Sequence, residues 1–309
     1  MEANEYNVLI IFYKNINRFR QSFDSICIAK PKNLFLYQDG PKSSEDIPAI
    51  MECRQYAESK IDWNCNIFKK YQTENFGCDP SNYIAQKWAF SVVDKCIVLE
   101  DDDICSLDFF RFCWSLLIKY ENDERVAMIC GMNVFDTYNN SGADYFFTSG
   151  GSIWTWASWR RFIDSWDETY SWLECKNKIE AMRPYFVSNK SFKSFIQLAK
   201  KRKKSGIAYY ETIMGVAQML NHQLNIVPTR NLISNIGNDG GVHSGKGNSS
   251  IPKKMQSLYH KKMFDLNFPL KHPTYINDDF EYKKMVYKIT HLNIIEIALL
   301  KIRKLLNSK

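Results

Sequence analysis

Short apolar runs alternate with segments of helical periodicity along the first half of the chain. Val8–Tyr13 is a continuous apolar run of strand length, typical of a strand buried on both faces of a parallel sheet. Phe19, Phe23 and Ile26 then recur at the spacing of one helix face. Further strands are predicted over 34–37, 63–71, 96–99 and 126–129, and helices over 17–29, 44–59, 80–93 and 106–120. This alternation predicts an α/β protein with a mostly parallel, doubly wound sheet flanked by helices.

The alternation stops after about residue 145, where the pattern of the chain changes. Residues 145–174 are rich in Trp, Gly and Ser, and a basic helix is predicted over 191–204. A further helix and a short strand are predicted between 206 and 228. The Gly-, Asn- and Ser-rich segment 235–250 is long enough to suggest a mobile lid.

The C-terminus has the pattern of a basic amphipathic helix. Its apolar face consists of Leu292, Ile295, Leu299, Ile302 and Leu306, with Lys301, Arg303 and Lys304 around it. Two interpretations stay open: a terminal helix docked on the domain, or an in-plane anchor attracted to anionic lipid.

Composition and charge narrow the class of protein. The 309 residues are 45% hydrophobic, which is enough for a sizeable core. A net charge of +7 fits an anionic ligand or an acidic membrane surface but is too small to indicate nucleic acid. Nine cysteines without a CxxC pair favour buried free thiols over a disulfide framework or a zinc site. The first apolar run is too short for a signal peptide or a membrane span, so we expect a cytoplasmic protein, soluble or peripheral at the inner membrane.

Four consecutive carboxylates, Glu100–Asp103, follow the apolar run Cys96–Leu99. Two unit charges about 4 Å apart repel by roughly 4 kcal/mol at an effective dielectric constant near 20. A protein tolerates this when a cation neutralises the charges or when they point into water. Ligands of α/β sheets bind at the carboxyl ends of strands, where Asp39 also falls, so we favour oxygen ligation of Mn²⁺ or Mg²⁺. The alternative is a solvated loop that leads into a helix capped by Ser106.

The stretch "VLEDDDICSLDFFRF" resembles the EDD signature of GT-A nucleotide-sugar glycosyltransferases. It is most similar to the N-acetylglucosaminyltransferase I family and to related bacterial polysaccharide glycosyltransferases. The resemblance extends from about Val8 to about His272. Its parts follow the order "YQDGP", "NFG", "LEDDD", "SGGSIWTWASWRR", "YYETIMGVAQ" and "SNIGNDGGVHS".

This resemblance implies roles for the acidic run. Asp102 would bind the metal that bridges the donor's phosphates, Asp101 would hydrogen-bond the ribose or sugar, and Glu100 would orient the cluster and approach the nucleotide. Asp103 has no counterpart in the signature and is expected to be an outer-shell or solvated residue.

The resemblance also implies roles for two loops near the donor. Asp39 would pair with uracil, and Asn75 and Gly77 would lie near the donor. Relatives often carry a basic residue after "NFG", whereas this chain has Cys78-Asp79-Pro80, which leaves phosphate contacts from this loop in doubt.

Catalytic and sugar-binding residues are implied in the second half. Glu211 aligns with the carboxylate base of inverting members, which is often Asp; the alternative is an ordinary helix-surface residue. Trp154 and Trp156 would form a wall that stacks on sugar rings, whereas Trp159 is expected to fill the core. The alternative for the first two is also the core.

Loop and helix residues with phosphate chemistry complete the expected site. His243 would complete the metal site or close over the pyrophosphate, although a lone His in a Gly-rich loop can equally be an ordinary loop residue. Lys246 is a possible phosphate contact. The basic run 200–204 is expected to be solvated, with contact to a lipid-diphosphate acceptor as the alternative.

Together these expectations describe a GT-A enzyme in three segments. Residues 1–145 would bind the nucleotide sugar, 146–275 would bind the acceptor and catalyse transfer, and 276–309 would form a basic helical tail. The expected activity is metal-dependent, inverting transfer of a hexosyl or N-acetylhexosaminyl group from a UDP-sugar. The acceptor would be a glycan or a lipid-linked glycan of a bacterial surface polysaccharide. A retaining transferase and a non-catalytic sugar-nucleotide- or glycan-binding protein remain as alternatives. A metal-dependent nucleotidyltransferase or phosphatase is a further rival, although "YKNINRFR" after the first strand lacks the glycines of a phosphate loop.

Overall fold

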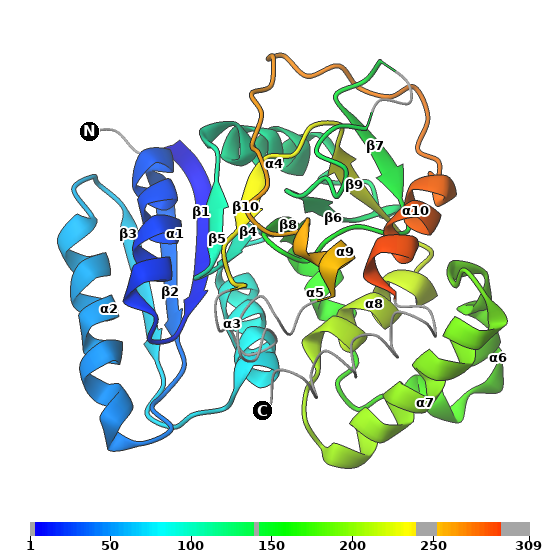
Figure 1. The fold of residues 1–309 in the computed structure, drawn as a ribbon, viewed down its shortest axis with the longest axis horizontal. Coiled ribbons are helices and arrows are strands. Elements are labelled where there is room, and N and C mark those ends of the chain that lie inside the picture. The colour runs from blue at the N-terminus through cyan, green and yellow to red at the C-terminus, as the bar shows by residue number, and fades with distance from the viewer. Residues whose placement is uncertain (1–3, 139–141, 239–251, 292–309) are drawn as a thin grey trace.

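The first half of the chain builds four parallel strands in the order β3-β2-β1-β4 (Figure 1). The structure is a computed structural model that describes residues 4–138, 142–238 and 252–291. The strands are β1 (Asn4–Phe12), β2 (Pro31–Gln38), β3 (Asn66–Tyr71) and β4 (Lys95–Glu100), and the connecting helices are α1 (Ile16–Ala29), α2 (Ile47–Lys60) and α3 (Cys78–Val92). The predicted alternation of strands and helices is confirmed here, with ends that differ by a few residues.

The second half extends the same sheet with strands of mixed direction. These are β6 (Val126–Cys130), β7 (Tyr145–Thr148), β8 (Trp156–Trp159) and β9 (Leu224–Pro228), and the full order is β3-β2-β1-β4-β8-β6-β9-β7. β6 and β9 are parallel, whereas β8 is antiparallel to both of its neighbours and β7 is antiparallel to β9. The protein is therefore a Rossmann-like α/β protein with a large, mostly parallel sheet, as the sequence predicts.

Helices cover both faces of the sheet. The helices after β4 are α4 (Leu107–Lys119), α5 (Arg160–Asp164), α6 (Lys176–Ala181), α7 (Asn189–Ser205), α8 (Tyr210–Leu220), α9 (Lys253–Gln256) and α10 (Phe280–Thr290), with short 3₁₀ turns at Ser44–Asp46, Ser171–Glu174 and Arg183–Tyr185. Along β1, Val8 and Ile10 enter the core beneath α1 and α4, while Leu9 and Ile11 enter the core beneath α3, α5 and α8. Burial on both faces explains why this strand is continuously apolar.

β8 corrects the expected nature of the Trp-rich segment. All four of its residues are buried, and Trp156 is 1% exposed. The strand lies in the middle of the sheet between β4 and β6, where both faces are covered by apolar side chains. Periodicity did not reveal it because the strand has only four residues and Ser158 interrupts its apolar run.

The described part of the expected C-terminal tail packs on the domain. Tyr282 of α10 is fully buried, and its hydroxyl accepts a hydrogen bond from the backbone N–H of Val134 (3.0 Å). The N–H of Asp279 donates to the carbonyl of Phe147 in β7 (2.8 Å). The apolar face predicted over 292–306 lies outside the described residues.

Two general features of the molecule follow from the structure. All nine cysteines carry free thiols, and five of them are buried. Among the helices of residues 4–138, 142–238 and 252–291, none combines the length and the apolar character needed to cross a bilayer.

Candidate functional site

The acidic run forms a turn at the carboxyl end of β4. Glu100 ends β4, Asp101 and Asp102 form the turn, and Asp103 begins β5 (Asp103–Cys105). The hydroxyl of Ser22 in α1 donates to the carbonyl of Glu100 (2.9 Å) and to that of Asp103. Ser22 of α1 therefore holds both ends of the turn. The carboxylates of the turn lie at the carboxyl-end edge of the sheet, where the topology predicts a ligand site.

Groups from two other elements contact the first two carboxylates. The N–H of Tyr13, directly after β1, donates to Asp101 Oδ2 (3.0 Å). The hydroxyl of Tyr210, the first residue of α8, donates to Glu100 Oε1 (3.2 Å). The cluster thus joins the end of β1 to the start of α8, whose Tyr210 lies 110 residues after Glu100 in the chain.

Negative charge is concentrated around Asp102. Burial is the main cause that raises the pKa of Asp101 to about 7, the pKa of Asp103 to about 8, and the pKa of Glu100 well above its usual range. The charge of Asp102 is the next cause in each case. A cation at Asp102 would relieve this repulsion, as the sequence argument anticipates.

Asp103 is buried. Of the two environments expected for it, outer-shell or solvated, the solvated one is wrong. Its side chain is fully buried and accepts hydrogen bonds from Thr155 Oγ1 (2.8 Å) and Asn235 Nδ2 (2.9 Å). The same Asn235 nitrogen donates to Asp102 Oδ1 (3.1 Å). Asp103 therefore holds the asparagine that orients Asp102, as an outer-shell residue would.

The segment after Asn235 passes directly over Asp102. β10 (Ile233–Asn235) pairs antiparallel with β5, and the N–H of Ile236 donates to the carbonyl of Asp102 (2.8 Å). A Cβ at Gly237 would lie 2.0 Å from Asp102 Oδ2, so a side chain there would force the carboxylate to move. Sequence analysis noted this Gly-rich stretch as a motif but singled out neither Asn235 nor Gly237. The signal was the motif "SNIGNDGGVHS" itself.

Asp39, at the end of β2, organises the loop that contains Asn75 and Gly77. Its Oδ1 accepts hydrogen bonds from the N–H groups of Gly40 and Phe76, each 2.9 Å long. Its Oδ2 accepts from Asn75 Nδ2 and from the N–H of Gly77, also at 2.9 Å. These four bonds occupy the four acceptor positions of a carboxylate. Contact between this carboxylate and a uracil ring would require one of them to be exchanged.

Two glycines allow this loop to form. A Cβ at Gly40 would lie 2.4 Å from the carbonyl oxygen of Glu74, so the two backbone segments can approach only with glycine there. Gly77 has a φ of +85°, a conformation that other L-residues rarely adopt, and it precedes α3. The three residues Asp39, Asn75 and Gly77, predicted from separate motifs, thus form one unit.

Glu211 lies in the first turn of α8 with an exposed side chain. The residue before it, Tyr210, contacts Glu100. The pKa of half-buried Cys78 responds to the charges of both Glu100 and Glu211. Burial raises the pKa of Cys78, and the charges of Glu100, Asp101 and Glu211 raise it further. Glu211 therefore lies on the helix turn whose first residue contacts the acidic run, and its expected role as base stays a prediction.

Trp154 and Tyr259 form an aromatic pair beside Asp102. Their ring centroids lie 5.0 Å apart, and both rings are half-buried. The residue after Tyr259, His260, donates from its N–H to the carbonyl of Asn235 (2.9 Å), whose side chain contacts Asp102. Burial raises the pKa of Tyr259, and the charge of Asp102 raises it further. Sequence analysis missed Tyr259 because no motif surrounds it.

The other two tryptophans of the segment belong to the core. Trp156, expected as part of a sugar-stacking wall, is buried in β8 and offers no face to a ligand, so that expectation is wrong. Trp159 is 3% exposed and donates from Nε1 to the carbonyl of Leu117 (3.0 Å), which confirms its expected core position.

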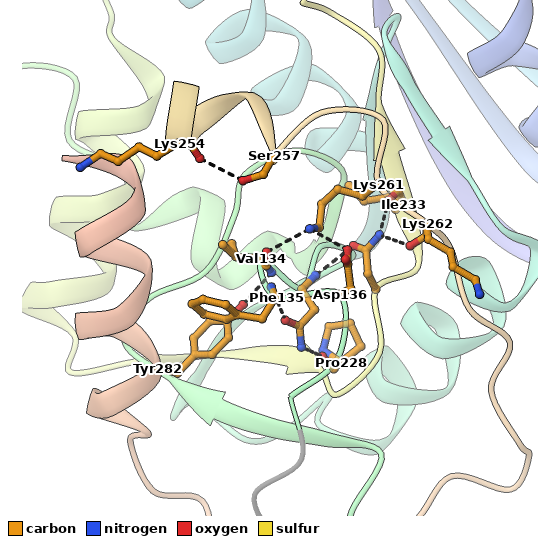
Figure 2. Close-up of polar contacts among 12 residues, drawn as sticks. Val134, Phe135, Asp136, Pro228, Ile233, Lys254, Ser257, Lys261, Lys262 and Tyr282 are labelled. Atoms are coloured by element: carbon orange, nitrogen blue, oxygen red, sulfur yellow. Dashed lines mark hydrogen bonds and ion pairs between the residues drawn. The ribbon is translucent and has the colours of Figure 1, made fainter. Parts of the chain in front are cut away.

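A buried lysine fixes the segment that carries Tyr259. Figure 2 shows Lys261 pointing toward Val134 and Asp136: its Nζ lies 2.7 Å from Asp136 Oδ1 and donates to the carbonyl of Val134 (3.0 Å). The Lys261 side chain is 5% exposed. The backbone N–H of His260 donates to the carbonyl of Asn235 (2.9 Å). Tyr259 is therefore held against the Asp102 segment from two sides.

The expected metal site is described in part. His243 and Lys246 lie outside the described residues, so their expected roles stay predictions. Within residues 4–138, 142–238 and 252–291, no group of three His, Cys, Asp or Glu side chains is arranged to hold a metal ion. Mg²⁺ and Mn²⁺ at phosphate sites are usually held by one or two carboxylates together with the phosphates. Asp102, oriented by Asn235 within a negative cluster, fits such a shared site.

A hollow of about 530 Å³ lies elsewhere, against the C-terminal part of α8. Trp172, Lys178, Ile213 and Leu220 are among the residues that line it. It includes neither the acidic run nor Glu211, and it is not the site described above.

Comparisons with known proteins give partial structural likenesses. No protein-family model matches the sequence, and no curated protein matches it either. One solved structure that resembles part of it is HddC from Yersinia pseudotuberculosis complexed with GMP-PN, with 13% identity, 52% of this chain and 79% of that chain covered, and a TM-score of 0.31.

Two more solved structures resemble the same share of the chain at 8% identity. UDP-glucose pyrophosphorylase complexed with UDP-glucose covers 52% of this chain and 78% of its own, with a TM-score of 0.32. 4-Diphosphocytidyl-2C-methyl-D-erythritol synthase from Anaerococcus prevotii covers 52% and 75%, with a TM-score of 0.31. Likeness at this level assigns no function to the present chain.

Proposed function

We propose that the protein is a metal-dependent, inverting GT-A glycosyltransferase that uses a UDP-sugar. The acceptor is a glycan or lipid-linked glycan in the synthesis of a bacterial surface polysaccharide. One observation carries the proposal. Glu211, a solvent-accessible carboxylate, directly follows Tyr210, whose hydroxyl donates to Glu100 of the acidic run at the ligand edge of a Rossmann-like sheet.

The donor end of the site is the acidic run. Asp102 would hold a divalent cation; Asn235 donates to its Oδ1, and Gly237 leaves room for the carboxylate. When bound, the cation supplies Lewis-acid stabilisation of the charge that develops on the leaving diphosphate. Glu100 and Asp101 face the nucleotide, held by Tyr210 and Tyr13 respectively.

The acceptor end of the site is the first turn of α8. Glu211 is exposed, so an acceptor hydroxyl can reach it from solvent. There the carboxylate takes the proton of the acceptor hydroxyl while the hydroxyl oxygen attacks the anomeric carbon and UDP leaves. This is general-base catalysis. The half-buried pair Trp154 and Tyr259 provides ring faces for the C–H side of a sugar near Asp102.

Thermal unfolding tests the donor half of this proposal. Wild type and Asp102→Asn would be heated with UDP, GDP or CMP, each with Mn²⁺ or with EDTA. A ligand that binds the native state alone raises the melting temperature by mass action. We expect UDP with Mn²⁺ to raise the melting temperature of the wild type. The variant should need at least a tenfold higher concentration of UDP and Mn²⁺ for the same rise.

The same experiment can overturn the proposal. Equal stabilisation of wild type and variant would remove Asp102 from the metal site, and the absence of any nucleotide effect would exclude nucleotide-sugar use. If UDP with Mn²⁺ stabilises the wild type as expected, a panel of UDP-sugars would identify the donor. The anomeric configuration of the product, measured by NMR, would separate inversion from retention.

A further inference from the structure

α7 presents a continuous lysine face to solvent. The helix has 17 residues and contains no acidic residue. A capping box between Ser188 and Ser191 fixes its start, and Gly206 in the left-handed conformation ends it. Phe192 and Ala199 are buried and mark the side packed on the protein. The exposed lysines are Lys190, Lys193, Lys200, Lys201 and Lys204.

Helical geometry gathers these five lysines on one side. At 100° per residue they fall within roughly 100° of arc, opposite the buried side, and they extend along roughly 20 Å of helix. Lys200 and Lys204 are four residues apart, a spacing at which like charges destabilise a helix by a few tenths of a kcal/mol. The helix dipole favours lysines in the last turn, such as Lys204, but disfavours Lys190 in the first turn, so helix stability does not explain the whole arrangement.

The carboxylates near α7 do not neutralise this face. Lys203 forms an ion pair with Glu174 (2.8 Å), and Arg202 lies over the Tyr209 ring at 4.5 Å and donates to Thr212. Those two basic residues point toward the protein. In the described part of the chain, no carboxylate forms an ion pair with any of the five exposed lysines.

Apolar side chains accompany the lysine face. Leu198, on α7 beside the lysines, is 43% exposed, and Ile207, in the loop to α8, is 42% exposed. A lysine stripe with exposed aliphatic side chains at its border suits a bilayer surface, where lysines meet lipid phosphates and aliphatic groups enter the interface. Nucleic acid is less well matched, since its binding faces usually add arginine forks or stacking aromatic rings.

We propose that the lysine face of α7 docks the protein on an anionic lipid bilayer. Binding is mainly electrostatic, because the apolar side of α7 is already used inside the protein. The docking does not depend on the proposed reaction. If that reaction is also correct, a lipid-linked acceptor meets the enzyme here, since the chain runs from the end of α7 at Ser205 to Glu211 in six residues.

Vesicle co-sedimentation of the full chain, without nucleotide, tests the docking. The vesicles would be phosphatidylcholine alone, or phosphatidylcholine with about one third phosphatidylglycerol. The variant carries Lys193→Gln, Lys200→Gln and Lys204→Gln. The control carries Lys32→Gln, Lys60→Gln and Lys69→Gln, which remove the same charge from exposed lysines on β2, α2 and β3. These elements lie at the opposite end of the molecule from α7 (Figure 1).

The expected results follow from the contribution of each lysine. Each lysine near an anionic surface strengthens binding by roughly fivefold, so the α7 variant should bind anionic vesicles at least tenfold more weakly. The control should bind like wild type, and added salt should weaken wild-type binding. Circular dichroism would verify that both variants are folded.

Three outcomes would overturn the proposal. Wild-type protein that ignores anionic vesicles would exclude membrane docking, whether or not it binds nucleic acid or acidic proteins. An α7 variant that binds like wild type would move the contact to another segment. An equal loss of vesicle binding in both variants would show that only the net charge of the protein matters, not the lysine face of α7.

Discussion

The two halves of the central sheet contribute to the site in different ways. In the first half, parallel strands deliver Asp39 and the Glu100–Asp103 run to one edge simply because each strand ends there. In the second half, the chain returns across these strand ends: Asn235 contacts Asp102 from 133 residues away, and Tyr259 lies beside it on a segment fixed by Lys261. The first half therefore places charge at the site, and the second half orients and covers it.

This difference separates two kinds of sensitivity to mutation. In the first half, Asp39 fixes a loop through four hydrogen bonds, so its loss should mainly reduce the free energy of unfolding. Groups from the second half act on a site that already exists, so their loss should mainly reduce ligand binding or turnover. The four predictions below are ordered from the largest expected effect to the smallest.

Glu211→Gln should give the largest effect, on turnover alone. The amide cannot accept the acceptor's proton, so the rate of UDP release from the best-binding UDP-sugar should fall roughly 10²- to 10⁴-fold. Stabilisation by UDP and Mn²⁺ should stay at the wild-type level. Glu52→Gln, an exposed residue of α2, is the matched control and should keep full activity. A Glu211→Gln protein with normal turnover would leave this carboxylate as an ordinary helix-surface residue.

Asp39→Asn should destabilise the first half. The new amide nitrogen faces two N–H donors that the carboxylate oxygen now satisfies, which should cost about 2–4 kcal/mol of unfolding free energy. Urea denaturation measures this cost. Asp62→Asn, whose side chain is 66% exposed, should change stability by less than about 0.5 kcal/mol. Equal stabilities of the two variants would contradict the organising role of Asp39.

Gly237→Ala should weaken the ligand site of the second half with little loss of stability. The added Cβ would collide with Asp102 Oδ2, so the carboxylate must move. We expect the Mn²⁺ concentration for half-maximal UDP stabilisation to rise about tenfold. Gly215→Ala provides the control, because a Cβ there meets nothing within 4 Å. That variant should bind normally and gain about 0.5–1 kcal/mol, since alanine favours a helix interior.

Lys283 should produce a small pH effect on stability. Burial lowers its pKa to about 8, against an opposing contribution from Asp278. Between about pH 8 and 10.5 the unfolded chain binds more protons at this side chain than the folded chain does, so the unfolding free energy rises with pH. Lys283→Met should show a smaller rise between about pH 7.5 and 9.5 in urea denaturation. Lys284→Met, on the exposed side of α10, should keep the wild-type slope.

Sequence reasoning located most of the first half and its polar residues. The strands through β4 were predictable because a strand buried on both faces is continuously apolar, and the acidic run was conspicuous directly after one. The bonds between Asp39 and the 75–77 loop were not predictable, although all three residues had been singled out. Motif resemblance names residues but does not say which of them contact each other.

The second half resisted prediction for a physical reason. Trp156 was taken for a ligand-facing residue because aromatic side chains serve both sugar stacking and cores, and no local pattern distinguishes the two. Tyr259 and Asn235 gain their positions from contacts with residues far away in the chain. Their surroundings, not their neighbours in sequence, make them part of the site.

The amino-acid sequence by itself determined the α/β class and the acidic edge of the sheet, which depend on periodicity and residue chemistry, both local properties. The candidate base Glu211 came from the resemblance of its motif to a known family. The tertiary structure alone decided that Trp156 is core, that Asp103 is buried behind Asn235, and that five lysines of α7 share one free face. Those facts depend on which elements pack together, and packing is fixed by contacts between residues that are distant in the chain.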